Sequence, residues 1–234
     1  MNVVDSVIKS ATDFYNTLSE DPNGRYRSWE YCYKCFHDAR KIPNADIDYL
    51  SLQLAFYLAS WGMYRGSSFL LQKDYKVHRI VVKEILKPKY DCLLGIKCKE
   101  LKDKFKLLAE LYQFIEKHYG EVRNNVKGVE IKSNPSSVLI TKVLMGTLGC
   151  VPAYDRYFID GVKNKEVASG QFGEKSIKSL IEFYEKNASQ LEAARKRLKA
   201  CELSYPQMKL LDMGFWQIGL ELDLERRKKK NQNT

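Results

Sequence analysis

Alternating apolar and polar residues, the pattern of a half-buried β-strand, are scarce in this sequence. Apolar residues instead recur at helical spacing, in about nine or ten stretches separated by turn residues. No stretch has a convincing strand pattern, which excludes folds built on a sheet. We therefore predict an all-α protein of many helices.

Long hydrophobic runs are also missing. The longest apolar stretch, at 50–64, is too short and too polar to span a bilayer. The first ten residues are amphipathic and lack the charged start and apolar run of a secretory signal. We therefore expect a cytoplasmic protein with reduced thiols and no membrane partner.

The familiar catalytic and metal-binding motifs do not occur. There is no phosphate-binding glycine loop, nucleophile elbow or zinc-protease motif, and the three histidines form no local pair. Cys32 and Cys35 form a C-x-x-C, but Cys92 and Cys98 are spaced too widely for the second half of a zinc site. We expect no metal and no cofactor, and free thiols packed in or near the core.

Positive charge is in excess. Lys and Arg number 39 against 29 Asp and Glu, a net charge of +10, which favours polyanionic partners, nucleic acid first and an anionic membrane surface second. Residues 225–234 carry five consecutive cations and are predicted to be a disordered, solvated tail. Residues 1–224 are predicted to form a single all-helical domain, in which 90–165 could be a lobe inserted between the N- and C-terminal helices.

A carboxylate stands at an unusual place in "GCVPAYDRYFIDGV" at 149–162. The apolar stretch before it is predicted to be a buried helix that Asn134 caps and Gly149 ends. Pro152 is predicted to open the next helix, so that Asp155 lies in its first turn, where the helix dipole favours a carboxylate. Acidic residues are common in first turns, so this position alone leaves a structural role open beside a chemical one.

The order of these elements resembles the core of the helix-hairpin-helix DNA glycosylases. In "SSVLITKVLMGTLGCVPAYDRYFIDGV" at 136–162, an apolar helix is followed by a proline-containing link and an Asp that opens the next helix. The family pattern P-x-x-D-x-x-F is matched by Pro152, Asp155 and Phe158. The resemblance implies a two-lobed glycosylase-like architecture. It also implies that a damaged or modified base is flipped out of duplex DNA and excised, with the Asp155 carboxylate as the catalytic group.

The sequence departs from that family at the hairpin itself. "SNPSS" at 133–137 replaces the glycine pair whose backbone N–H groups hold a DNA phosphate, although a helix start at Asn134, Ser136 and Ser137 could still bind one. The place of the Schiff-base lysine of bifunctional members falls near Ser136, so the resemblance implies hydrolysis without lyase activity. The four-cysteine iron–sulfur loop of some members is absent.

Further candidate residues come from aromatic and basic positions. Asp212 and Trp216 share a face of the last helix and could complete a substrate pocket, or Asp212 could pair with a buried cation. The aromatic residues predicted to stack on a base are Trp61, Tyr64, Tyr154 and Tyr157. The additional residues predicted to bind phosphate are Arg65, Lys142 and Arg156.

Three functional hypotheses follow. The first is a DNA-binding protein that hydrolyses the N-glycosidic bond of a flipped base through Asp155. The second is a helical nucleic-acid-binding or interaction module without catalysis, as the lost glycine hairpin would indicate. The third is a defence protein that acts on modified foreign DNA. Duplex DNA is the expected partner.

Overall fold

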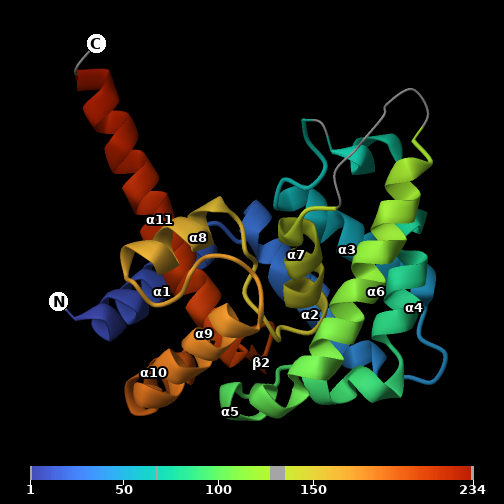
Figure 1. Ribbon diagram of the computed structural model, residues 1–234, viewed down its shortest axis with the longest axis horizontal. Helices are drawn as coiled ribbons and strands as arrows, with labels where there is room; N and C mark the ends of the chain where they lie inside the picture. Colours follow the sequence, from blue (N-terminus) through green and yellow to red (C-terminus); the bar gives the residue numbers. More distant parts are fainter. Residues whose placement is uncertain (1, 67, 127–134, 233–234) are drawn as a thin grey trace.

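The computed structural model describes residues 2–66, 68–126 and 135–232. In this part of the chain, regular structure consists of eleven α-helices, five short 3₁₀ turns and one two-residue antiparallel hairpin, β1 (Lys199–Ala200) with β2 (Leu203–Ser204). The predicted all-α class is confirmed (Figure 1).

The helices of the described residues follow in chain order. They are α1 (Val3–Glu20), α2 (Ser28–Ala39), α3 (Ile47–Ser60), α4 (Arg79–Ile85), α5 (Cys98–Leu101), α6 (Phe105–Asn124), α7 (Ser137–Thr147), α8 (Arg156–Asn164), α9 (Glu174–Lys186), α10 (Ala188–Arg195) and α11 (Gln207–Gln232). The 3₁₀ turns are η1 (Arg25–Arg27), η2 (Phe69–Gln72), η3 (Tyr75–His78), η4 (Pro88–Leu93) and η5 (Lys102–Lys104). Asn187 separates α9 from α10.

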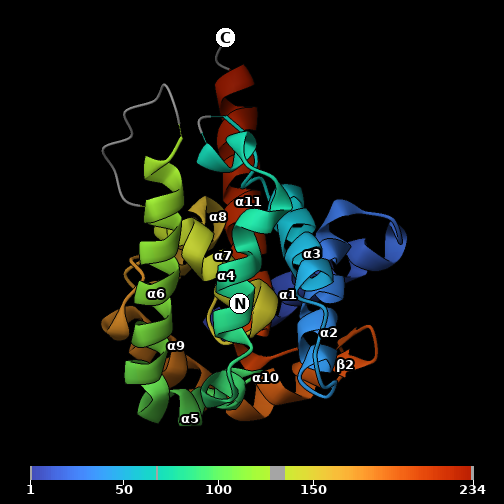
Figure 2. The same ribbon diagram turned by 90° about the vertical axis from the view of Figure 1, so that its right-hand side faces the viewer.

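Helix α7 lies in the interior of the molecule, between α2, α3 and α6 (Figures 1 and 2). Nine of its eleven residues are buried, as its nearly continuous apolar sequence predicts. One of the nine is a lysine, Lys142, so the interior of the molecule contains a cation that needs a partner.

Helices α8 and α11 pack backbone to backbone. A Cβ atom built on Gly161 would lie 1.9 Å from the carbonyl oxygen of Phe215, and one built on Gly219 would lie 1.9 Å from that of Tyr157. Only glycine permits this approach, which brings the start of α8 against the middle of α11. The first half of α11 is buried on all sides and also packs against α1.

The C-terminal residues differ from the sequence prediction. Residues 225–232, expected to be a disordered tail, continue α11, which extends past α8 and away from the helical bundle (Figure 1). Their side chains are exposed. Within the described residues, no helix combines the length and apolar character needed to cross a bilayer.

Candidate active site

Asp155 lies at the start of α8, but as its N-cap residue and not in its first turn. The helix begins at Arg156, and the Oδ1 atom of Asp155 accepts a hydrogen bond of 3.2 Å from the backbone N–H of Phe158. Pro152 does not open the helix as predicted; it is buried in the non-helical link that precedes Asp155. An Asp is a preferred N-cap because its carboxylate satisfies a backbone donor that the first turn leaves free.

The second oxygen of Asp155 is bound by two donors from distant helices. Lys142 of α7 places its Nζ atom 2.9 Å from Oδ2, and the indole N–H of Trp216 in α11 donates to the same oxygen at 3.3 Å. The Lys142 side chain is 2% exposed and that of Asp155 is 16% exposed. The lysine predicted to bind phosphate is therefore buried in the protein and forms an ion pair with the predicted catalytic carboxylate.

A second buried ion pair lies beside the first. Lys209 Nζ is 2.8 Å from Asp212 Oδ2, and both side chains are almost fully buried. The other oxygen of Asp212 accepts a hydrogen bond of 2.9 Å from the backbone N–H of Ala153. Asp212, predicted either to line a pocket or to pair with a cation, does the latter and also holds the link that carries Asp155. We name Lys142, Asp155, Lys209 and Asp212 the buried charge cluster.

The link before α8 is fixed at a further point. The hydroxyl of Thr141 in α7 accepts a hydrogen bond of 3.0 Å from the backbone N–H of Tyr154 and donates one of 2.7 Å to the carbonyl of Ser137. Thus Thr141 holds the link, and the next residue of α7, Lys142, holds Asp155. The position of the Asp155 carboxylate is determined by α7, α8 and α11 together.

Aromatic rings surround the buried charge cluster. The ring centroids of Trp61 and Trp216 are 5.7 Å apart, Tyr157 lies 5.3 Å from Trp216, and Tyr26 lies 5.0 Å from Trp61. The two lysines lie over the Trp61 ring, with Nζ–centroid distances of 5.0 Å for Lys142 and 5.3 Å for Lys209. The rings supply apolar walls and a favourable electrostatic surface for the two ammonium groups.

Two polar groups in these walls are notable. The indole Nε1 of Trp61 is buried, and in the described part of the chain it has no hydrogen-bond partner. Such an orphaned donor is rare and can serve an acceptor of a ligand. The pKa of the Tyr57 hydroxyl lies well above its usual range because the group is buried and because Asp212 and Asp155 place negative charge nearby.

The structure brings only some of the predicted pocket residues to the Asp155 carboxylate. Trp61, Tyr157 and Trp216 lie around it. Tyr154 does not: it is buried in the core, and its hydroxyl hydrogen-bonds to Ser176 at 2.8 Å. Tyr64 does not either: its hydroxyl hydrogen-bonds to Nε2 of the fully buried His78 at 2.7 Å. Burial, together with the negative charge of Asp74, raises the pKa of the Tyr64 hydroxyl to about 12.

The predicted phosphate-binding residues are scattered. Arg65 is exposed, and Arg156 is 60% exposed while pairing with Asp223 of α11 at 2.8 Å. Ser136 caps α7 by accepting from the N–H of Leu139, and Ser137 is the first residue of that helix. Asn134 lies outside the described residues.

The cysteines are all free. Cys32 is buried and Cys35 is partly exposed, one turn apart on α2. Among the described residues, no three His, Cys, Asp or Glu side chains come together as a group that could hold a metal ion.

Lys209 is the residue at this site that sequence reasoning missed. Its spacing of three residues from Asp212 is the ordinary spacing of a helical ion pair and was its one visible signal. Comparisons with models of protein families, with curated proteins and with solved structures gave no match. The resemblance to the helix-hairpin-helix glycosylases remains a prediction.

Proposed function

We propose that the protein binds duplex DNA and hydrolyses the N-glycosidic bond of a flipped, damaged or modified base, with Asp155 as the catalytic carboxylate. The observation that carries this proposal is the setting of Asp155: a partly exposed carboxylate among tryptophan and tyrosine rings, held by α7, α8 and α11. A carboxylate held in a low-dielectric aromatic setting is suited to stabilising positive charge on a sugar. The resemblance at 136–162 supports the same assignment, and a two-lobed glycosylase-like architecture belongs to the proposal.

The proposed reaction is a hydrolysis. The bond between C1′ and the base nitrogen breaks, and its electron pair leaves with the base, which takes up a proton. Asp155 stabilises the positive charge that develops at the sugar and accepts a proton from water as the water oxygen bonds to C1′. Asp155 then releases that proton to solvent, which supplies the proton that the base takes up. Lys142 and Trp216 would orient the carboxylate through Oδ2, and Oδ1 keeps a lone pair besides the one that caps α8.

The exposed end of α11 offers a surface for the phosphate backbone. Arg226 lies about 15 Å along the helix from Trp216, at a rise of about 1.5 Å per residue. Arg226 and Arg227 are each 64% exposed, and Arg156 lies beside them on α8. Because the stretch beyond residue 225 has no apolar side chains, a polyanion in water suits it better than a membrane surface.

The second candidate function is a helical nucleic-acid-binding module without catalysis. It is favoured by the fact that both oxygens of Asp155 already have partners within the protein, as the carboxylate of a purely structural N-cap would. A defence protein acting on modified foreign DNA would use the chemistry of the first candidate on a different substrate.

The test uses duplex oligonucleotides that carry damaged or modified bases, with alkali cleavage of the abasic sites formed. Asp155→Asn keeps an N-cap residue but removes the charge, and we expect it to lower the cleavage rate by roughly 100-fold or more. Asp103→Asn, an exposed Asp-to-Asn change in η5, is the matched control and should cleave as the wild type does.

The outcomes of these measurements distinguish the two candidate functions. Strand breaks that persist unchanged in Asp155→Asn would remove Asp155 from catalysis. Salt-sensitive DNA binding without breaks on any substrate would favour the binding module. If the wild-type protein does not bind DNA, both candidates fail. Circular dichroism of Asp155→Asn separates a loss of chemistry from a loss of fold.

A further inference from the structure

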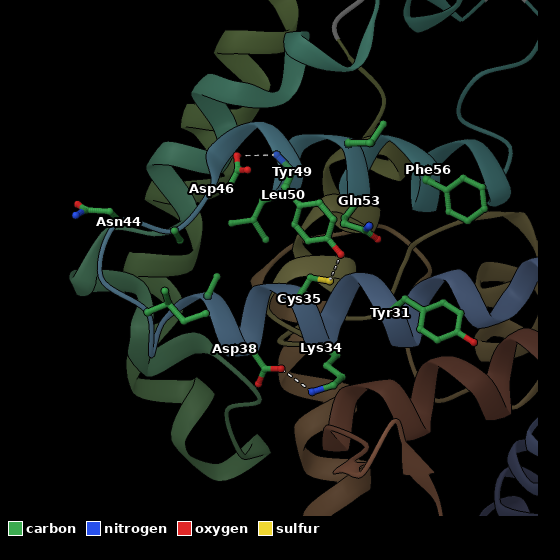
Figure 3. A pocket seen from close by; sticks show the side chains of 14 residues that line it. Tyr31, Lys34, Cys35, Asp38, Asn44, Asp46, Tyr49, Leu50, Gln53 and Phe56 are labelled. Atoms are coloured by element: carbon green, nitrogen blue, oxygen red, sulfur yellow. Dashed lines mark hydrogen bonds and ion pairs between the residues drawn. The ribbon is translucent and has the colours of Figure 1, made fainter.

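A groove runs along the outside of the molecule between α2 and α3 (Figure 3). Its volume is about 980 Å³, and apolar side chains dominate its lining. Of the eight large apolar side chains that are exposed in the described residues, five line this groove, with exposed fractions between 45% and 60%: Tyr31, Ile42, Tyr49, Leu52 and Phe56. We name it the α2–α3 groove.

Helix α3 is apolar on two sides. One side is buried in the core through Leu50, Leu54 and Leu58. The other presents Tyr49, Leu52 and Phe56 to the groove, at the i, i+3 and i+7 spacing of a helix-packing face. Figure 3 shows the rings of Tyr49 and Phe56 on the side of α3 that faces the groove. An apolar face of this kind is typical of a helix that packs against another on both sides.

The charged side chains that line the groove have partners within the chain. Lys34 and Asp38 form an ion pair of 2.6 Å, and the Asp46 carboxylate caps α3 by accepting from the N–H groups of Asp48 and Tyr49. These three lining charges sum to −1, whereas the whole chain carries +10. Two copies of the chain can therefore approach here with little of the repulsion that their net charge produces elsewhere.

The pattern of the lining is complementary to itself. The stretch of α2 and its C-terminal turn that lines the groove runs from residue 31 to residue 42, and its midpoint falls between Lys34 and Asp38. A two-fold axis through that midpoint reverses the direction of α2. It therefore places Lys34 of each copy beside Asp38 of the other, with the apolar side chains of the two copies between the helices.

The exposed apolar area fits a dimer of standard size. A large side chain that is half exposed leaves roughly 100 Å² to bury, since an aromatic residue buries 150–250 Å² in full. The five exposed side chains thus supply roughly 500 Å² from each copy, and the aliphatic stems of Lys34 and Gln53 add to it. Standard interfaces bury about 800 Å² per partner.

We propose that the α2–α3 groove is the interface of a symmetric homodimer, in which the α2–α3 hairpins of two copies pack as a four-helix bundle. This interface is independent of the proposed DNA chemistry, because Asp155 and its partners do not line the groove. Two antiparallel helix pairs packed in this way bury both of their apolar faces.

The first test is the molar mass in solution, measured by sedimentation over a range of protein concentrations. We expect the wild type to be a dimer. We expect Leu52→Glu, which buries an unpaired charge in the interface, to raise the dissociation constant by roughly 100-fold or more. The matched controls Leu71→Glu and Ile80→Glu change residues of similar exposure outside the groove and should leave the dimer unchanged.

The second test addresses the two-fold arrangement. Asp38→Lys puts like charges together across the axis and should weaken the dimer, while the double variant Lys34→Asp with Asp38→Lys restores opposite charges and should recover it. Cys35 lies near the middle of the groove, so a short bismaleimide should link two copies. Cys35→Ser should abolish this link and Cys92→Ser should keep it.

Three results would overturn the proposal. The first is a single-chain mass for the wild type at every concentration, including the case in which the monomer binds a foreign amphipathic helix in the groove. The second is a dimer that Leu52→Glu leaves intact. The third is equal weakening by Leu52→Glu and Leu71→Glu. A failure of DNA cleavage would not affect these measurements, and a monomeric wild type would not affect the assignment of Asp155.

Discussion

Charged side chains are usually exposed and large apolar side chains are usually buried. The buried charge cluster departs from the first rule, and the α2–α3 groove departs from the second. In the cluster, Lys142, Lys209 and Asp212 are almost fully buried, and only 16% of the Asp155 side chain is exposed. In the groove, Phe56 and Ile42 are left about 60% exposed although the protein has a large core elsewhere. Desolvated charge and exposed apolar area both reduce the stability of an isolated chain.

These two exceptions are held in place by different means. The charges are fixed by hydrogen bonds from three helices, and each carboxylate of the cluster also accepts from a backbone N–H group. Most of the groove side chains project from the sides of α2 and α3 opposite to those buried in the core, and no other element of the described chain covers them. Substitutions should therefore unfold the protein at the cluster and leave its fold intact at the groove.

The largest effect is expected from removing one charge of the cluster. Asp212→Ala leaves Lys209 buried without a counter-ion and the N–H of Ala153 without an acceptor, and should lower the free energy of unfolding by about 3–5 kcal/mol. Urea denaturation measures this. The double variant Lys209→Met with Asp212→Asn removes both charges, keeps an acceptor for Ala153, and should recover most of the loss. A loss of only about 0–1 kcal/mol in Asp212→Ala is what an exposed ion pair would give. It would contradict the expectation that the cluster is more sensitive to substitution than the groove.

A smaller effect is expected at the helix contact that supports the cluster. Gly161→Ala places a Cβ atom 1.9 Å from the carbonyl oxygen of Phe215 and should force α8 away from α11, at a loss of about 1–3 kcal/mol or more. Thermal denaturation gives the loss, and tryptophan fluorescence reports whether Trp216 has moved from Asp155. Gly173→Ala, where a Cβ atom meets nothing within 4 Å, is the matched control and should change neither measurement.

A third effect is expected from His78, a buried side chain that is neutral, unlike the side chains of the buried ion pairs. It should make the free energy of unfolding depend on pH. Burial, with a smaller contribution from His118, lowers the pKa of His78 to about 3, and the ring is held by the hydroxyls of Tyr64 and Tyr119. The unfolded chain binds a proton near pH 6.5, but the folded protein does so only near pH 3. This residue therefore stabilises the fold fully above pH 6.5, and the contribution is lost as the pH falls towards 3, by up to about 1.4 kcal/mol per pH unit.

The measurement is urea denaturation of the wild type and of His78→Gln over that pH range. The variant should be less stable at neutral pH, but its stability should fall less steeply between pH 6.5 and pH 3. Parallel pH profiles for the two proteins would show that His78 does not supply this dependence.

The smallest effect is expected in the groove. Leu52 is 49% exposed and Leu54 is fully buried, although they lie two residues apart on α3. In dilute solution, Leu52→Ala should change the free energy of unfolding by no more than about 0.5 kcal/mol. Leu54→Ala should lower it by about 2–5 kcal/mol. Similar losses for the two variants would mean that the groove face is already packed within one chain.

Sequence reasoning predicted the elements well where a local period sets them. Residues 3–10 of the amphipathic N-terminal stretch lie in α1, and the apolar stretch before Asp155 corresponds to α7. It failed where two local preferences compete. Pro152 favours a helix start and Asp155 favours an N-cap, and because tertiary hydrogen bonds to Ala153 and Tyr154 hold the link non-helical, the helix begins after Asp155. The basic C-terminal stretch continues the helix that precedes it.

The candidate site was predicted only in part. The position of Asp155 beside Trp216 agrees with their shared assignment to one site. The role of Lys142 could not be read from the sequence, because a lysine in a helix is ordinarily solvated and its partner lies 13 residues further along the chain, on another helix. Tyr154 and Tyr157 are both tyrosines near Asp155 in the sequence, and nothing in the local sequence shows which of them is buried. In the structure, Tyr154 points into the core.

By itself, the sequence determines the helical class, the burial of α7, the basic charge and the place of an acidic residue at the start of α8. These follow from apolar periodicity and from the preferences of single residues for helix ends, which act over one or two turns. Only the tertiary structure decides which lysine meets which aspartate and which apolar faces remain outside. Those outcomes depend on how α7, α8 and α11 cross and on what α2 and α3 leave uncovered, and contacts between residues so far apart in the chain leave no local pattern.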